Sequence, residues 1–331
     1  MQLGIAYSNS VSESRRPNPP PTEVYRTIVG RLINAIKCLL AAVGLSVALL
    51  TPQAHANCVG FANVAMTNGY NFIANPVSNT SSTNGNSLTN LFSSGVPDGT
   101  LVYLWDISSQ AFTAPAIYST NTSSWSTNFS LPVGRGFVLK TTKAWTNTFV
   151  GDIVTGNLTN FFIGNNNLSL LGALVPISTN LVNLFFPKID GENVYTFKPG
   201  SQTYSDAFSY FSGWGWFDPI GAVNTNGPVI NVGQSFFVQN PRPDTNWVVN
   251  FSCGLGPLNA ALPDGSSSHE IQSLSLSADS TTLNVNLGGA YDVEFSTDGL
   301  IWTKVATKQT GNIWRGPRPS TPQGFYRVTT R

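Results

Sequence analysis

The sequence predicts an all-β protein, in which two tandem, mutually packed β-sandwich-like repeats precede a small immunoglobulin/fibronectin-like β-sandwich. Three observations support this fold class. The 331-residue chain is 41% hydrophobic and 11% aromatic but only 10% charged, so it has enough apolar material for packed cores. Short apolar runs recur between Asp-Gly and other glycine turns, as expected for β-strands. Finally, no capped amphipathic run is long enough to predict a major helix.

An internal repeat defines the first two domains. The aligned pairs are "NSLTNLFSSGVPDGTLVYLWDISSQAF" (86–112) with "TNLVNLFFPKIDGENVYTFKPGSQTY" (179–204), "LPVGRGFVLK" (131–140) with "INVGQSFFVQ" (230–239), and "WTNTFVG" (145–151) with "WVVNFSCG" (247–254). Within the first pair, Asp98-Gly99 matches Asp190-Gly191, and Ser109-Gln110 matches Ser201-Gln202. No linker rich in proline or serine separates the two units, so we expect them to pack together.

The strands of each repeat are apolar on both faces. In "TLVYLWD" (100–106), alternation places Val102 with Leu104 and Tyr103 with Trp105 on opposite faces. Such a strand suits the interior of a sandwich. Three aromatic pairs recur at corresponding places of the repeats, which indicates core packing: Trp105/Phe197, Phe137/Phe236 and Trp145/Trp247.

A stretch rich in Gly, Pro and Ser, "GPLNAALPDGSSSHE" (256–270), precedes the third domain. There, "YDVEF" (291–295) predicts a half-buried strand with Asp292 and Glu294 on a solvated face. The predicted division is 1–56 for an N-terminal extension and signal peptide, 57–163 for the first repeat, 164–256 for the second, 257–270 for the linker, and 271–331 for the C-terminal sandwich.

The N-terminal segment has the features of an export signal. Basic residues at Arg26, Arg31 and Lys37 precede the uncharged run 38–50, and a small-x-small cleavage site follows before Asn57. Thirteen apolar residues are too few to span a bilayer comfortably. We therefore expect an extracellular or cell-surface protein, with the periplasm as the alternative, and no membrane span after signal cleavage.

Signal cleavage leaves two cysteines, Cys58 and Cys253. In an oxidising compartment an even pair of this kind predicts a disulfide. The alternative is two separate buried thiols. A disulfide would tether Cys58, which lies at the mature N-terminus.

The repeat reads G-[YW]-N-[FL]-I-x-N-P … D-G-x-x-V-Y-x-[WF] … G-x-x-[FW]-F-V, and the chain ends on "GFYRVTT". Together these motifs resemble a repeat and a terminal domain in exported proteins of the Verrucomicrobia–Planctomycetes type. The resemblance implies secreted or surface-displayed β-modules, largely of unassigned function, and it supplies no catalytic residues. The second repeat departs from the pattern because it lacks the equivalent of Asn75-Pro76.

The residue inventory argues against most enzyme classes. Of the two histidines, His55 falls in the signal peptide and His269 in the linker, so a Ser-His-Asp triad or a histidine-rich metal site is nearly excluded. A net charge of +1 offers no basic face for nucleic acid. We expect no catalytic residues, metal or cofactor. A glycoside-active enzyme with paired carboxylates is the remote alternative.

One aromatic run, "YFSGWGWFDP" (210–219), is a candidate ligand site comprising Tyr210, Trp214, Trp216 and Asp218. Only one of its tryptophans can correspond to Trp125 of the first repeat. On a strand, the W-G-W alternation would aim both indoles at one face, and indole faces stack on sugar rings. The sequence thus predicts a non-catalytic protein with a structural or adhesive role, whose partners are polysaccharide or surface proteins. The alternative is a carbohydrate-binding protein that uses Tyr210–Asp218.

Overall fold

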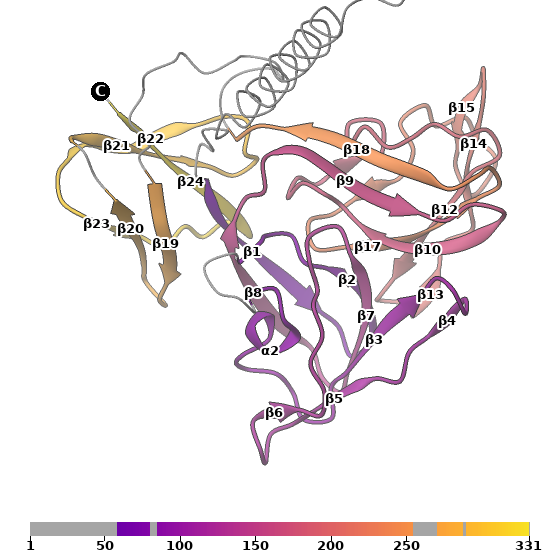
Figure 1. Cartoon of the computed structure of the whole chain (residues 1–331), viewed down its shortest axis with the longest axis horizontal. Coiled ribbons are helices and arrows are strands. Elements are labelled where there is room, and N and C mark those ends of the chain that lie inside the picture. Colours follow the sequence, from indigo (N-terminus) through magenta and orange to yellow (C-terminus); the bar gives the residue numbers. More distant parts are fainter. Residues whose placement is uncertain (1–57, 80–84, 254–269, 287–288, 331) are drawn as a thin grey trace, which may run out of the picture. The chain divides into compact units, whose positions relative to one another are not determined.

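The all-β prediction is confirmed (Figure 1). The computed structural model describes residues 58–79, 85–253, 270–286 and 289–330. In these ranges the only helix is α2 (Leu88–Leu91), and all other regular elements are strands. The predicted signal peptide and almost all of the predicted linker lie outside the described residues.

Two six-stranded sheets form the first two-thirds of the fold, and their strands follow the same order. The first sheet runs β2-β7-β3-β5-β6, with β4 on β3, and the second runs β10-β17-β12-β14-β15, with β13 on β12. The strands of the first sheet are β2 (Gly69–Ala74), β3 (Leu101–Asp106), β4 (Ala111–Phe112), β5 (Ala116–Ser119), β6 (Ser124–Trp125) and β7 (Gly136–Thr141). Those of the second are β10 (Asn167–Gly172), β12 (Asn193–Lys198), β13 (Thr203–Tyr204), β14 (Phe208–Phe211), β15 (Gly215–Phe217) and β17 (Ser235–Asn240).

Further strand pairs pack with these sheets around a large apolar core. They are β1 (Val59–Met66) with β8 (Trp145–Asp152), β9 (Gly156–Phe162) with β18 (Thr245–Phe251), and β11 (Thr179–Asn180) with β16 (Val229–Ile230). The core draws residues from both sheets, including Val102 and Val194 at matching strand positions. Phe137 and Phe236 are fully buried in it, as the repeat comparison predicts.

The correspondence drawn between Trp145 and Trp247 is wrong by two residues. Trp247 is fully buried, and its Nε1 donates a hydrogen bond to the carbonyl oxygen of Leu184 at 2.9 Å. In the first half, Asn147 has this role, because its Nδ2 donates to the carbonyl oxygen of Leu91 at 3.0 Å. The Asn147 amide and the Trp247 indole therefore occupy equivalent positions in the two halves. An alignment that pairs tryptophan with tryptophan misses this equivalence.

Two glutamines connect the two sheets, because the side chain of each one hydrogen-bonds to the backbone of the other sheet. Gln202, in the β12–β13 turn, accepts the Tyr70 N–H at 2.6 Å and donates to the Tyr70 carbonyl at 3.0 Å. Gln110, in the β3–β4 turn, accepts the Leu168 N–H at 2.7 Å and donates to its carbonyl at 3.1 Å. Each side-chain amide thereby acts like one peptide group of an added strand on the edge strand of the other sheet. We call these contacts the glutamine clamps.

The C-terminal strands share a sheet with the first strand of the chain. One sheet has the order β22-β21-β24-β1-β8, and a three-stranded sheet has the order β19-β20-β23. These strands are β19 (Glu270–Leu276), β20 (Ser280–Asn286), β21 (Tyr291–Ser296), β22 (Thr303–Gln309), β23 (Ile313–Pro317) and β24 (Gln323–Thr330). Val59 and Phe61 of β1 belong to the core between the two sheets, so β1 serves both the first half and the C-terminal region.

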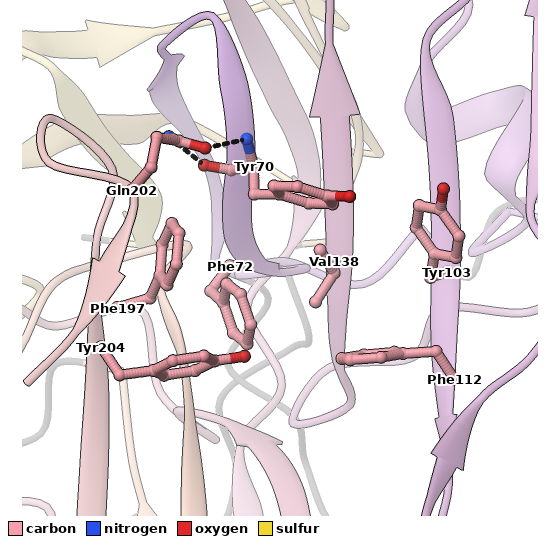
Figure 2. Close-up of a pocket in the computed structure, with 8 residues that line it drawn as sticks. All are labelled: Tyr70, Phe72, Tyr103, Phe112, Val138, Phe197, Gln202 and Tyr204. Carbon is pink, nitrogen blue, oxygen red and sulfur yellow. Dashed lines mark hydrogen bonds between the residues drawn. The ribbon is translucent and has the colours of Figure 1, made fainter.

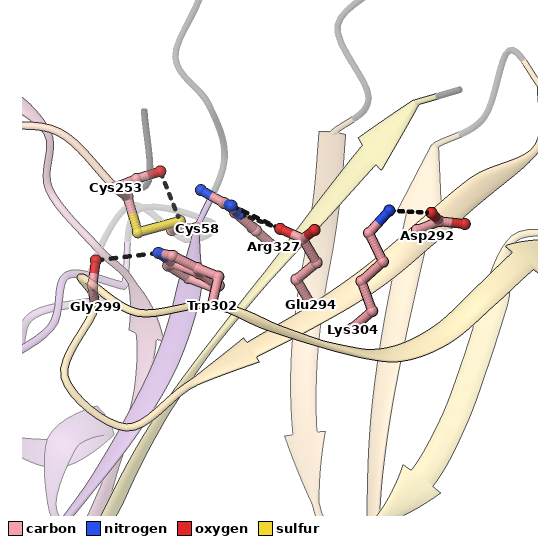
Figure 3. A network of polar contacts seen from close by, with 8 residues as sticks. All are labelled: Cys58, Cys253, Asp292, Glu294, Gly299, Trp302, Lys304 and Arg327. Atoms are coloured by element: carbon pink, nitrogen blue, oxygen red, sulfur yellow. Dashed lines mark hydrogen bonds and ion pairs between the residues drawn. A yellow bond between two sulfur atoms is a disulfide. The ribbon is translucent and has the colours of Figure 1, made fainter. Parts of the chain in front are cut away.

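The expectation of a solvated face for Asp292 and Glu294 is wrong. Both residues are buried, and each carboxylate is paired: Asp292 with Lys304 at 2.9 Å and Glu294 with Arg327 at 2.6 Å (Figure 3). The Arg327 guanidinium also lies 4.3 Å from the centroid of the Trp302 ring. Buried carboxylates need such partners, and the strands on either side of β21 provide them.

Cys58 and Cys253 are joined by a disulfide (Figure 3). Cys58 immediately precedes β1, and Cys253 lies two residues after β18. The bond thus ties the start of the first half to the end of the second across 195 residues of sequence.

Candidate functional site

The structure separates the two tryptophans of the predicted site. Trp216 lies in β15 and is 1% exposed, whereas Trp214 lies in the preceding turn and is 70% exposed. The expectation that both indoles share one face is therefore wrong. Gly213 and Gly215 have positive φ angles of 85° and 93°, a conformation that glycine adopts readily, so the backbone turns on both sides of Trp214 and β15 begins only at Gly215.

Trp216 has a structural role that the first sheet repeats. It pairs with Tyr210 across β14 and β15, and the two ring centroids lie 5.5 Å apart. In the first sheet, Trp125 pairs with Tyr118 in the same way, at 5.2 Å. Trp214 has no counterpart in this scheme. Asp218, the last predicted site residue, stabilises the following turn by accepting the N–H groups of Ile220 and Ala222.

Equivalent aspartates anchor the turns at the ends of both sheets. The Asp190 carboxylate accepts the Ser212 N–H at 2.8 Å, and the Asp98 carboxylate accepts the Thr120 N–H at 2.7 Å. The bonds from Thr120, the backbone one first, hold the pKa of Asp98 below its ordinary value of 3.8. The anchor is thus common to both turns, although the residues that the turns present differ.

The turn between β14 and β15 presents an apolar surface. Phe211, Trp214 and Phe217 line an open depression of about 430 Å³, together with Asp190 and Ser212. The rings of Phe211 and Phe217 meet edge to face at 5.5 Å, and Phe211 is exposed. We call these five residues the aromatic tip. In the first sheet the equivalent turn is polar and exposed, with Asn121, Thr122 and Ser123 at its end.

A second candidate site lies where the outward faces of the two sheets meet, and the sequence does not predict it. Two adjoining cavities open there, of about 330 Å³ and 530 Å³, and Phe112 and Tyr204 line both. We call them together the aromatic groove, and Figure 2 shows the residues that line the smaller cavity. Its aromatic lining consists of Tyr70, Phe72, Tyr103, Trp105, Phe112, Tyr195, Phe197, Tyr204 and Phe237.

The rings of the groove are held in place by one another and by hydrogen bonds. Phe72 stacks on Phe197 at 4.6 Å, and Trp105 meets Phe237 edge to face at 4.9 Å. The Trp105 Nε1 donates to the carbonyl oxygen of Leu168 in the other sheet at 2.9 Å. Burial raises the pKa of the Tyr204 hydroxyl from 10.0 to about 12, further above physiological pH, where the group is neutral.

Alternation along the strands predicted which rings share a face but did not predict this groove. Tyr103 and Trp105 lie on the face of β3 opposite Val102 and Leu104, as predicted, but the two faces have different surroundings. Val102 and Leu104 enter the large core. The other face meets the second sheet only in part, and its rings line cavities. A pattern of two apolar faces predicts burial on both sides and does not reveal such a gap.

Glu192 is the most perturbed acid of the described residues. It is fully buried directly before β12, and neither carboxyl oxygen has a hydrogen-bond partner within the described chain. Burial raises its pKa from 4.5 to about 9, so the carboxyl group is protonated at neutral pH. The equivalent residue in the first half is Thr100, whose hydroxyl donates to the carbonyl oxygen of Pro97 at 2.7 Å.

In the part of the chain that the structure covers, no three His, Cys, Asp or Glu side chains gather as a group that could hold a metal ion. None of the helices in that part is long and apolar enough to cross a membrane.

In comparisons with known proteins, no family model matched the chain, and no curated protein or solved structure showed significant similarity to it. The resemblance to exported repeat proteins stays a prediction from the motifs. The function of the chain therefore has to be inferred from the two aromatic sites themselves.

Proposed function

We propose that this chain is a secreted or surface-displayed, non-catalytic β-modular protein with an adhesive role, and that its aromatic tip contacts a protein on a cell surface. One observation carries the proposal. Trp214 is 70% exposed in a turn that Asp190 anchors, whereas the equivalent turn of the first sheet exposes only small polar residues. An exposed apolar patch on an ordered element is typical of an interaction site.

The geometry of the tip suits a contact in which its apolar surface is buried against a partner. Phe211 and Trp214 both expose apolar surface, and aromatic residues are enriched at the centres of protein interfaces. The Asp190 carboxylate accepts a hydrogen bond from the Ser212 N–H and forms an ion pair with Arg242 at 3.5 Å, so it fixes the turn. The export predicted from the N-terminal segment supports a location where such a contact can form.

The test compares binding of the labelled protein to cells of its source with binding of a Trp214→Thr variant. Threonine reproduces the polar character of the first sheet's turn. We expect a loss of about tenfold or more in affinity, as for a central interface tryptophan. Phe185→Thr is the matched control, because Phe185 is 56% exposed but lies outside the tip. Equal cell binding by the Trp214→Thr variant and the unmodified protein would refute the proposal.

The alternative is that Tyr210–Asp218 binds carbohydrate. Treating the cells with protease or with periodate distinguishes this alternative from binding to a protein. Protease treatment should abolish binding through the tip if the partner is a protein. Periodate oxidation of surface sugars should abolish it if the partner is a polysaccharide. The alternative has one observation in its favour, which is that the Ser212 side chain and the Asp190 carboxylate line the same depression as Trp214.

A further inference from the structure

The aromatic groove differs from the tip in shape and chemistry. Its two cavities lie in the size range of small-molecule sites and combine many rings with few polar groups. Figure 2 shows Phe112 and Tyr204 extending toward one another from the two sheets, with the rings of Phe197 and Phe72 above Tyr204 in this view. Phe112 is 40% and Tyr204 is 47% exposed, so both rings still present surface to a ligand.

The walls of the groove are fixed before any ligand arrives. The clamp from Gln202 holds the backbone of Tyr70, and Gln202 itself lines the smaller cavity. On the other side, the clamp from Gln110 and the Trp105 indole both bond to Leu168, which lines the larger cavity. A site with ordered walls binds its ligand with little loss of conformational entropy.

The charge of the groove indicates which ligands it suits. Among the described residues that line the two cavities, Asp206 alone carries a formal charge, and it is exposed. The hydroxyl groups of Tyr103 and Tyr204 make no hydrogen bond to any other described residue, so they can serve a ligand. The lining therefore offers ring faces, neutral hydroxyl groups and one carboxylate that can accept hydrogen bonds.

We infer that the aromatic groove binds a neutral, unbranched oligosaccharide chain, a function independent of the aromatic tip. The apolar C–H faces of a sugar ring pack on aromatic faces, and its hydroxyl groups need donors and acceptors at the rim. A neutral sugar matches a groove with a single charge. A wholly apolar ligand would make no hydrogen bond with the Tyr103 hydroxyl or the Asp206 carboxylate. Because Phe112 and Tyr204 border both cavities, a chain of several sugars fills both, with different units on either side of these rings.

The experiment measures binding of neutral oligosaccharides to the purified protein by calorimetry. The probes are hexasaccharides of β-linked glucose, xylose and mannose, and the disaccharide of whichever binds. We expect at least one hexasaccharide to bind, and to bind more tightly than its disaccharide. Phe112→Ala and Tyr204→Ala should each weaken binding by about tenfold, which is the size expected for one aromatic contact. Tyr204→Phe retains the ring and should lose less.

Control variants distinguish binding in the groove from binding at the tip, and control ligands distinguish neutral sugars from other occupants of the groove. Trp214→Thr should leave oligosaccharide affinity unchanged, and Phe112→Ala should leave cell binding through the tip unchanged. A charged hexasaccharide of galacturonic acid should bind more weakly than the neutral chains. The inference is overturned if none of the neutral hexasaccharides binds, if both alanine variants bind normally while retaining their circular dichroism spectrum, or if a polyproline peptide occupies the groove more tightly than any sugar.

Discussion

The turn between β5 and β6 and the turn between β14 and β15 have the same framework and different surfaces. In both, an aspartate accepts a backbone N–H at the start of the turn, and a tyrosine packs on a tryptophan behind it. The first turn ends in polar residues, while the second ends in Trp214. The shared residues therefore maintain the fold, and the residues that differ, Trp214 among them, are those that we propose contact a partner.

The largest effect should come from the disulfide that ties the two halves together. Replacing Cys58 and Cys253 with serine frees the start of the first half from the end of the second. Because the closed loop is long, we expect the free energy of unfolding to fall by about 2–5 kcal/mol. Urea denaturation of the double variant and of the reduced protein should agree. An unchanged midpoint in both would show that the halves do not depend on this tether.

Glu192 and Thr100 occupy equivalent buried positions of the two halves but differ in chemistry, because only Glu192 can ionise. The pKa of Glu192 is about 9 when folded and 4.5 ordinarily, so the folded state binds one more proton between these values. The contribution of Glu192 to stability should therefore be greatest below about pH 4.5 and should fall as pH rises toward 9, by at most about 1.4 kcal/mol per pH unit. Glu192→Gln cannot ionise. Its thermal unfolding should lack this pH dependence and give a higher midpoint at pH 8, and an identical pH profile for both proteins would contradict the assignment.

The two glutamine clamps have the same geometry, and removing each one tests whether they also contribute equally to the free energy of unfolding. Gln110→Ala and Gln202→Ala each remove two hydrogen bonds to an edge strand. We expect each variant to lose about 1–3 kcal/mol of unfolding free energy, and the two losses to agree within about 0.5 kcal/mol. Chemical denaturation measures both. If one clamp proves much more costly to lose than the other, the reciprocal contacts do not contribute equally.

The smallest effect on stability should come from the residue that most distinguishes the two turns. Trp214→Thr removes an exposed ring that packs on little, so we expect the free energy of unfolding to change by no more than about 0.5 kcal/mol. Trp216→Thr is the matched comparison, since it empties a buried position and should cost about 3–5 kcal/mol. Thermal denaturation of the two variants separates the exposed ring, which we propose contacts a partner, from the ring that fills the core.

The all-β class was predictable because strand alternation and turn residues are local signals. The role of Gln110 and Gln202 was not, although the sequence comparison aligned them. Their clamps join residues 58 and 132 positions apart in the chain, and nothing local specifies which edge strand a turn will meet. The burial of Asp292 and Glu294 was missed for the same reason, since their partners come from other strands.

The candidate site was predictable in part. The repeat comparison indicated correctly that one tryptophan of "YFSGWGWFDP" belongs to the framework, and the structure identifies it as Trp216. Strand alternation misplaced the other, because glycines with positive φ on both sides keep Trp214 in a turn. The aromatic groove depends on how far two sheets separate, a distance that side-chain patterns along one strand do not encode.

The position of β1 has a consequence for how the protein folds. This strand is hydrogen-bonded on one edge to β8 and on the other to β24, where Val59 lies opposite Tyr326. The first described strand therefore completes its pairing only after β24, at the far end of the described chain, has been synthesised. Folding that depends on contacts so distant in sequence is slow. A polypeptide that crosses a membrane before folding, as the predicted signal peptide requires, benefits from such a delay, because its native sheet cannot close while the chain is still being made.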